Sequence, residues 1–235
     1  NDFAADATSA TNETRLTDVS IATAAGMPAQ YDTVQFDLTA SGNTIDSIAV
    51  YSTAEDADDL DWYASDSATS NAYATGITGS SMATVSAGWS VRTGVTVSSS
   101  SPATRYYYMR QSAGANNTLT EVILGTKLSL TNVTLSGQEG ANYGNDLVSS
   151  YGGNEFSNQR HGSKKFWNFS LEHINSSYKT SLETMRDAVD GAHYKFLYYD
   201  GSSYNYVRMS DDSLRFNEIA YGVYSTTIQL TEQLS

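Results

Sequence analysis

The sequence contains no cysteine and only two prolines among its 235 residues. Without cysteine the chain can form neither a disulfide bond nor a thiolate metal site, and it has no thiol nucleophile. Charged residues make up only 17% of the chain, and 13 Lys and Arg stand against 26 Asp and Glu. The resulting net charge of −13 opposes binding to nucleic-acid phosphates and to anionic lipid. Apolar runs of about 18 residues are also missing, so we expect no membrane span.

Recognisable catalytic signatures are missing too. The three histidines, His161, His173 and His193, are scattered along the chain. Neither a phosphate-binding glycine loop, nor an HExxH metal motif, nor a GxSxG nucleophile motif is present. The paired carboxylates Asp211 and Asp212 fall in a predicted turn, where Asp commonly binds the backbone. We therefore expect no enzymatic activity and assign no catalytic residue.

The missing charge is replaced by Ser, Thr, Asn, Gly and 17 Tyr, a composition that favours strands and turns. In the first half, short β-patterned segments are separated by clusters of Gly, Ser, Asn and Asp. This spacing is typical of a β-sandwich or jelly roll. The predicted strands are Thr33–Leu38, Ser47–Ser52, Ser90–Val97, Ala103–Arg110 and Leu119–Leu124.

One segment of this half, Ala54–Ala74, is acidic and aromatic and shows no regular period, so it is predicted to be a long loop. Its carboxylates could supply the oxygen ligands that Ca²⁺ prefers, although the spacing and the glycine of an EF-hand are missing. A solvated acidic loop is the alternative interpretation. The candidate metal ligands are Asp56, Asp58, Asp59 and Asp61.

Aromatic residues of the same segment suggest a second hypothesis. Trp62, Tyr63 and Tyr73 could stack on sugar rings and form a glycan-binding rim. The alternative is that they cover the ends of the sandwich while Trp89 lies in the core.

The second half, after a short strand at Lys127–Leu130 and a boundary near residues 130–135, has another organisation. A strand with an apolar face is followed by one amphipathic helix that Asn175 or Ser176 could cap and that Gly191 could end. A hairpin around Asp200-Gly201 and two further strands complete an antiparallel α+β domain. The predicted elements are the strand Lys164–Ile174, the helix Ser176–Val189, the hairpin strands His193–Tyr199 and Ser203–Met209, and the strands Ser213–Ile219 and Val223–Glu232.

A basic segment stands out in this acidic chain. Arg160, Lys164 and Lys165 are predicted to lie in a hairpin that contacts acidic surface on an adjacent subunit. An exposed, solvated turn is the alternative.

The first half resembles the discoidin-type (F5/8 type C, galactose-binding-like) jelly roll in the order and spacing of its strands. The resemblance implies that residues 1–130 form a β-sandwich whose loops bind carbohydrate or another surface ligand. It is carried by Val34–Leu38 (VQFDL), Ile45–Tyr51 (IDSIAVY), Arg105–Arg110 (RYYYMR) and Leu119–Gly125 (LTEVILG).

The second half resembles the sheet-and-helix domain of tailed-phage distal tail proteins and of related tail-tube and tail-tip proteins. The resemblance implies that residues 131–235 form a homo-oligomeric ring, commonly six-fold, through which DNA passes. It also implies contacts with tail tube and tail hub proteins, and a place in the virion tail after assembly in the host cytoplasm. It is carried by Gly152-Gly153, Arg160–Lys165, Phe166–Leu171, the helix, Phe196–Asp200, Tyr206–Met209, Leu214–Phe216 and Leu230–Glu232, in that order.

Together these patterns predict a mainly β protein without a cofactor, and a Ca²⁺ ion in the acidic loop is the one candidate. We expect a structural protein of a bacteriophage tail or baseplate, with an outward β-sandwich that binds host-surface glycan or other tail proteins. The alternative is a carbohydrate-binding module of a bacterial surface or secreted protein.

Overall fold

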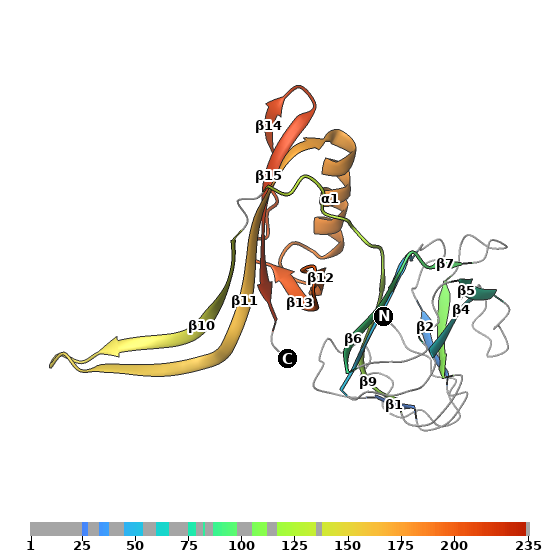
Figure 1. Ribbon diagram of the computed structural model, residues 1–235, viewed down its shortest axis with the longest axis horizontal. Helices are drawn as coiled ribbons and strands as arrows, with labels where there is room; N and C mark the ends of the chain where they lie inside the picture. Colours follow the sequence, from blue (N-terminus) through green and yellow to red (C-terminus); the bar gives the residue numbers. More distant parts are fainter. Residues whose placement is uncertain are drawn as a thin grey trace. The chain divides into compact units, whose positions relative to one another are not determined.

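A computed structural model describes residues 25–27, 33–37, 45–53, 60–65, 75–78, 82, 87–97, 105–111, 117–134 and 138–233. The fold is mainly β, as expected (Figure 1). The chain divides into two units, Asn1–Lys127 and Leu128–Leu234, whereas the sequence suggested a boundary at residues 130–135. Within the described ranges, no helix is long and apolar enough to cross a membrane.

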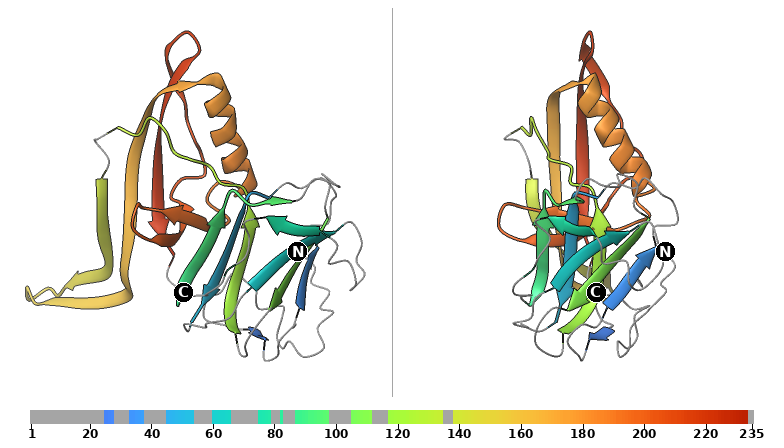
Figure 2. Two further views of the ribbon diagram at one scale, coloured as in Figure 1. Left: turned by 45° about the vertical axis from the view of Figure 1, so that its right-hand side comes forward. Right: turned by 90° about the vertical axis from the view of Figure 1, so that its right-hand side faces the viewer.

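The first unit contains two antiparallel sheets (Figure 2). The four-stranded sheet has the order β1 (Ala25–Met27), β9 (Asn117–Gly125), β3 (Ser47–Ser52), β6 (Gly88–Thr93). The five-stranded sheet has the order β2 (Thr33–Asp37), β8 (Tyr106–Gln111), β4 (Leu60–Ser65), β5 (Thr75–Thr78), β7 (Thr96–Val97).

Apolar residues from both sheets form one buried core, as in a β-sandwich. The apolar residues recur at every second position of these strands. Because every second side chain of a strand points to the same face, they line the face that is turned to the core. In β3 the buried Ile48 and Val50 share a face, and in β8 the buried Tyr107 and Met109 do. This confirms the sandwich predicted from the strand spacing.

Two predicted strands, one in this unit and one at its boundary with the second, differ from the structure. Ser90–Val97 is interrupted at Gly94, whose φ of +74° suits glycine and breaks the segment into β6 and β7. Lys127–Leu130 is not a strand and pairs with no described strand. The backbone amide of Lys127 instead donates a hydrogen bond to the side-chain oxygen Oδ1 of Asp46, at 2.7 Å.

The second unit contains a six-stranded antiparallel sheet and one described helix. The sheet order is β10 (Gln138–Ser149), β11 (Glu155–Asn175), β15 (Val223–Glu232), β13 (Tyr204–Met209), β12 (Phe196–Tyr199), with β14 (Asn217–Ala220) also paired to β15. The buried Leu182 of the helix, α1 (Ser176–Ala188), belongs to the same apolar core as Phe169 and Leu171 of β11. The helix, the hairpin at Asp200-Gly201 and the closing strand confirm the predicted α+β arrangement.

Local chemistry sets both ends of α1. The Asn175 side chain caps the helix by accepting a hydrogen bond from the Tyr178 amide at 2.8 Å. At the other end Gly191 has a φ of +62°, and its amide donates to the Arg186 carbonyl at 3.0 Å. The two cap candidates in the sequence are thus resolved in favour of Asn175.

Candidate functional site

The largest departure from the sequence prediction is a long two-stranded ribbon formed by β10 and β11. Strand β11 pairs with β15 only from Phe166 onward, while β10 follows it outward as far as Ser149. From Ala141 to Lys165 the ribbon therefore has no third described strand, and Figure 1 shows it projecting from the sheet. We call this segment, Ala141–Lys165, the arm.

The tip of the arm is a hydrogen-bonded turn. The Ser150 amide donates to the Asn154 carbonyl at 2.7 Å, and the Asn154 amide donates to Ser150 Oγ at 3.1 Å. Gly153 closes the turn with a φ of +80°. The turn leaves the Tyr151 ring fully exposed at the end of the arm.

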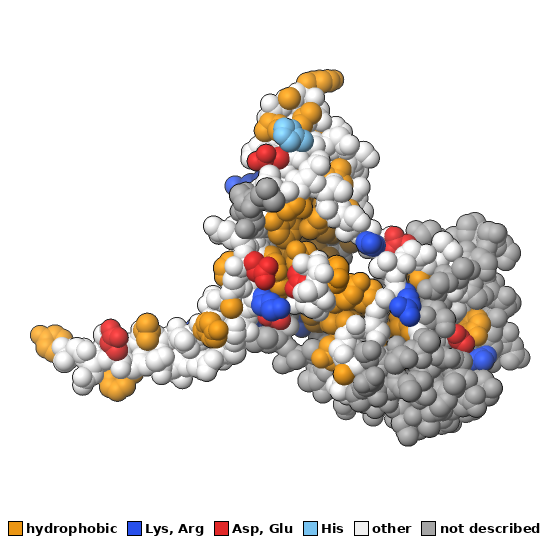
Figure 3. Space-filling model, in the orientation of Figure 1, with side chains coloured by type: hydrophobic (Ala, Val, Ile, Leu, Met, Phe, Trp, Pro, Cys, Tyr) orange, Lys and Arg blue, Asp and Glu red, His pale blue; other side chains and the backbone are white. Residues whose placement is uncertain are grey.

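Apolar side chains along the outer arm are exposed to solvent, as Figure 3 shows. The exposed fractions are 72% for Leu147, 60% for Val148 and 62% for Phe156. Tyr143, closer to the body of the unit, is also exposed. Several large apolar side chains gathered on a narrow ribbon are unusual for a surface that stays in water and are typical of a contact site.

These side chains occupy both faces of the ribbon. Val148 pairs directly with Phe156, so their side chains lie together on one face. Leu147 pairs with Ser157 and points to the opposite face, because neighbouring residues of a strand alternate. The outer arm therefore presents apolar surface in two opposite directions.

Arg160, Lys164 and Lys165 do belong to a hairpin, the one formed by β10 and β11, but they lie within strand β11 and not in a turn. Arg160 forms an ion pair with Asp146 of β10. Lys164 and Lys165 are neighbours in the strand and point to opposite faces, so the three cations form no single patch. Whether they contact another subunit stays a prediction.

Two glycines of β10 make room for aromatic rings of β11. A Cβ atom on Gly140 would lie 2.7 Å from Cζ of Phe166, so the Phe166 ring covers this glycine. The His161 imidazole covers Gly144 in the same way. The register of the two strands shifts between Tyr143 and Asn145, which gives a physical cause for the bend of the ribbon seen in Figures 1 and 2.

The base of the arm is tied to the sheet by a side chain of β15. Glu232 Oε2 accepts a hydrogen bond from the Lys165 amide at 2.8 Å. This residue is the first one of β11 beyond its pairing with β15, which ends at Phe166 and Thr231. The carboxylate thus extends the hydrogen bonding of the sheet by one position.

No protein-family model matches this chain. A search of curated proteins finds no match either. The resemblances to discoidin modules and to phage tail proteins therefore stay expectations drawn from residue patterns.

The predicted glycan rim is wrong at Trp62. This residue lies in β4, inside the predicted loop, and its ring is 2% exposed in the sandwich core, 5.8 Å from the ring of Phe36. Tyr63 is half-buried, with the Arg110 guanidinium carbon 5.6 Å from its ring centre. Tyr73 lies outside the described residues, and Trp89 is half-buried beside Tyr51 rather than in the core.

Only one of the four candidate Ca²⁺ ligands lies among the described residues. Asp56, Asp58 and Asp59 lie outside the described residues, while Asp61 is a half-buried residue of β4. Among the residues that the structure does describe, no three carboxylates or histidines gather to hold a metal ion.

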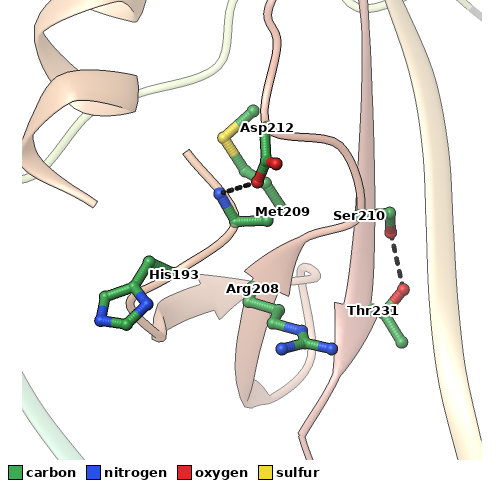
Figure 4. Close-up of a pocket in the computed structure, with 7 residues that line it drawn as sticks. His193, Arg208, Met209, Ser210, Asp212 and Thr231 are labelled. Carbon is green, nitrogen blue, oxygen red and sulfur yellow. Dashed lines mark hydrogen bonds between the residues drawn. The ribbon is translucent and has the colours of Figure 1, made fainter. Parts of the chain in front are cut away.

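A shallow surface pocket of about 420 Å³ lies where β13 and β15 meet the segment after α1 (Figure 4). His193 and Arg208 line it, but its other polar groups have partners already. Ser210 Oγ and Thr231 Oγ1 share a hydrogen bond of 2.7 Å, and Asp212 accepts from the Ala192 amide at 3.3 Å. The hydroxyl and the carboxylate are thus not arranged around His193 as a nucleophile and an orienting acid would be.

Among the described residues, the acid whose pKa is lowered most, Asp200, lies in the turn between β12 and β13. The backbone amide of Ser203, and then that of Ser202, hold the pKa of Asp200 far below its ordinary value of 3.8. Both amides donate to Asp200 Oδ1 at 2.8 Å. These hydrogen bonds close a tight turn, so the lowered pKa of Asp200 has a structural explanation.

Among these features, the arm is the one whose exposed apolar side chains are typical of a surface that contacts another molecule. A ribbon of two strands with exposed apolar side chains is marginally stable by itself in water, and packing against another surface would stabilise it. The arrangement supports protein–protein contact, and sequence reasoning missed it because β10 was not recognised as a strand.

Proposed function

We propose that this chain is a structural component of a bacteriophage tail. In this proposal residues 131–235 assemble with further copies into a ring at the distal end of the tail or at the baseplate. Residues 1–130 form a β-sandwich that faces outward and binds host-surface glycan or other tail proteins.

The single observation that carries the proposal is the arm, Ala141–Lys165, with its exposed Leu147, Val148 and Phe156. A folded protein that acted alone would gain nothing from holding these side chains in water, where they favour aggregation. Contact with another copy would remove them from water and would support the ribbon. Where the arm contacts a different surface of the next copy, such a contact repeats from copy to copy and can close into a ring.

The assignment to a tail rests on the resemblance in chain order described above. It implies a homo-oligomer, commonly six-fold, with tail tube and tail hub proteins as neighbours and DNA passing through the channel. The net charge of −13 suits that role, because DNA would not adhere to the ring.

The alternative is a carbohydrate-binding module of a bacterial surface or secreted protein. Its most specific support was the aromatic rim, and the burial of Trp62 removes one of the three residues proposed for it. A binding module also needs no projecting ribbon. The assembly role therefore has the better support.

Sedimentation and electron microscopy of the purified chain test the proposal. We expect ring-sized particles or tubes whose fraction rises with protein concentration. A matched variant replaces Gly144–Gly162 by an Asn-Gly turn that joins the paired residues Tyr143 and Ser163. This variant should remain monomeric while keeping the circular dichroism of a folded β protein.

Two results would contradict the proposal. One is a wild-type chain that stays monomeric at every concentration up to its solubility limit. The other is a variant without the outer arm that forms the same particles as the wild type, since assembly would then not depend on the arm.

A further inference from the structure

The segment Leu128–Thr134, which we call the connector, leads from the first unit into the second. Its two leucines are half-buried and pack against the apolar core of the second unit. The hydroxyl of Tyr178, on α1, binds the backbone of the connector twice. It donates to the Ser129 carbonyl at 2.9 Å and accepts from the Thr131 amide at 3.1 Å. The first half of the connector is therefore held by the helix.

The second half of the connector lies along the edge of β11, beyond the residues that pair with β10. The Thr134 amide donates to the Ser170 carbonyl at 2.9 Å, and the Glu172 amide donates to the Asn132 carbonyl at 3.1 Å. The Asn132 side chain also donates to the His173 carbonyl at 3.1 Å. The connector thus extends the hydrogen bonding of the sheet on this side of β11.

These contacts coincide with an irregularity of β11. Its pairing with β15 shifts between Leu171 and Ile174, where His173 has a φ of +55°. Such a shift disrupts the hydrogen bonding of a strand locally. The connector binds two backbone groups at this place, the Glu172 amide and the His173 carbonyl. It therefore belongs to the fold of the second unit.

The first unit holds the chain up to the residue before the connector. The Asp46 amide donates to the Gly125 carbonyl at 3.0 Å, and the Asp46 side chain accepts from the Lys127 amide at 2.7 Å. The last residue fixed by one unit and the first residue packed on the other, Lys127 and Leu128, are thus neighbours in the chain. Seven free residues could span about 24 Å, and the bound connector gives none of this reach.

We propose that the connector is a strap that confines movement between the units to one hinge, the link between Lys127 and Leu128. The first unit then turns about a point and is not carried on a tether. The inference does not depend on the proposed function, because it rests on contacts within each unit. In the proposed assembly, the sandwich could turn towards a ligand but could not reach out for it.

Trypsin digestion of the native full chain tests the strap, because Lys127 is exposed and cleavage after it separates the units. A protease cleaves a bond whose neighbours are released from the fold. Tyr178→Phe removes the hydroxyl that binds Ser129 and Thr131, so it should speed cleavage after Lys127 by about fivefold or more. Mass spectrometry of the fragment that begins at Leu128 measures the rate.

Two controls separate the strap from general stability. Tyr221→Phe removes a hydroxyl from a fully exposed ring in the turn between β14 and β15, and it should change the rate after Lys127 by less than about twofold. Cleavage after Arg186, in α1, is followed in the same digests. It should proceed in Tyr178→Phe as in the wild type, because only the connector is released.

Hydrogen exchange of the full chain, followed by nuclear magnetic resonance, gives a second measurement. The amides of Thr134 and Glu172 should exchange at least about tenfold more slowly than in an unstructured peptide, because both are hydrogen-bonded. The Leu128 amide donates to no described residue and should exchange near the peptide rate. A single fast position between protected neighbours is the pattern expected of a hinge.

Three results would overturn the inference. They are wild-type cleavage after Lys127 as fast as in Tyr178→Phe, exchange of the Thr134 and Glu172 amides at the peptide rate, and faster cleavage after Arg186 in step with that after Lys127. None of these measurements involves assembly, so a failure of this inference and a failure of the proposed function can be told apart.

Discussion

The indole ring of Trp62 is buried between the sheets of the first unit, with 2% of its surface exposed. Trp62→Ala should lower the free energy of unfolding of this unit by about 3–5 kcal/mol, because the removed ring leaves a cavity in a packed core. Urea denaturation followed by circular dichroism measures this loss. Tyr63→Ala, at the half-buried neighbouring position, is the control and should cost clearly less. Equal losses for the two variants would contradict the assignment of Trp62 to the core.

The lowered pKa of Asp200 predicts that the stability of the second unit depends on pH. Its pKa is lowered in the folded state, so its carboxylate contributes stability above the ordinary value of 3.8, and this contribution is lost as the pH falls through the lowered pKa. Asp200→Asn should therefore flatten the fall in melting temperature between about pH 5 and pH 3. Thermal unfolding of both proteins across this range measures the difference. Parallel curves for wild type and variant would contradict the prediction.

At single positions, local chemistry could be predicted where it depends on neighbours in the chain. The turn at Asp200-Gly201 and the stop at Gly191 belong to this kind. Trp62 was misassigned, although Leu60, Trp62 and Ala64 alternate with more polar residues, because the acidic residues before them suggested a loop. Whether an aromatic residue lies in a core or on a rim depends on the opposite sheet, which one segment does not reveal.

At the scale of elements, the cap of α1 gives a measurable contribution. Asn175→Ala should lower the free energy of unfolding of the second unit by about 1 kcal/mol, because the Tyr178 amide loses its acceptor. Asn175→Ser keeps an acceptor and should recover most of the loss. Chemical denaturation of the three proteins tests this, and a neutral Asn175→Ala would contradict the capping role.

The helix and the hairpins could be predicted because period, cap and turn residues are local signals. Strand β10 could not, for a physical reason. Its residues are exposed on both faces over most of their length, so Gln138–Ser149 shows no alternation of apolar and polar residues. Contacts between β10 and β11 depend on two strands at once, so one segment of sequence does not reveal them. Examples are the pairing of Val148 with Phe156 and the packing of the Phe166 and His161 rings over Gly140 and Gly144.

At the scale of the whole molecule, each unit has a hydrophobic core of its own, with residues from both sheets in the first unit and from the sheet and α1 in the second. Denaturation should therefore proceed in two transitions rather than one. The separate chains 1–127 and 128–235 should each reproduce one of them. A single transition seen by both fluorescence and circular dichroism, with neither fragment folded, would contradict this independence.

In the proposed assembly, the ribbon from Ala141 to Lys165 would affect the timing of assembly as well as its geometry. Strand pairs without a third strand open more readily than the body of a sheet, so we expect the arm of a free chain to be unpaired for part of the time. The first contact between two chains must then order an arm and bring the chains together at once, whereas each later chain meets a surface that is already formed. Growth would accordingly show a lag and a threshold concentration, and a cell could accumulate the chain before any ring appears.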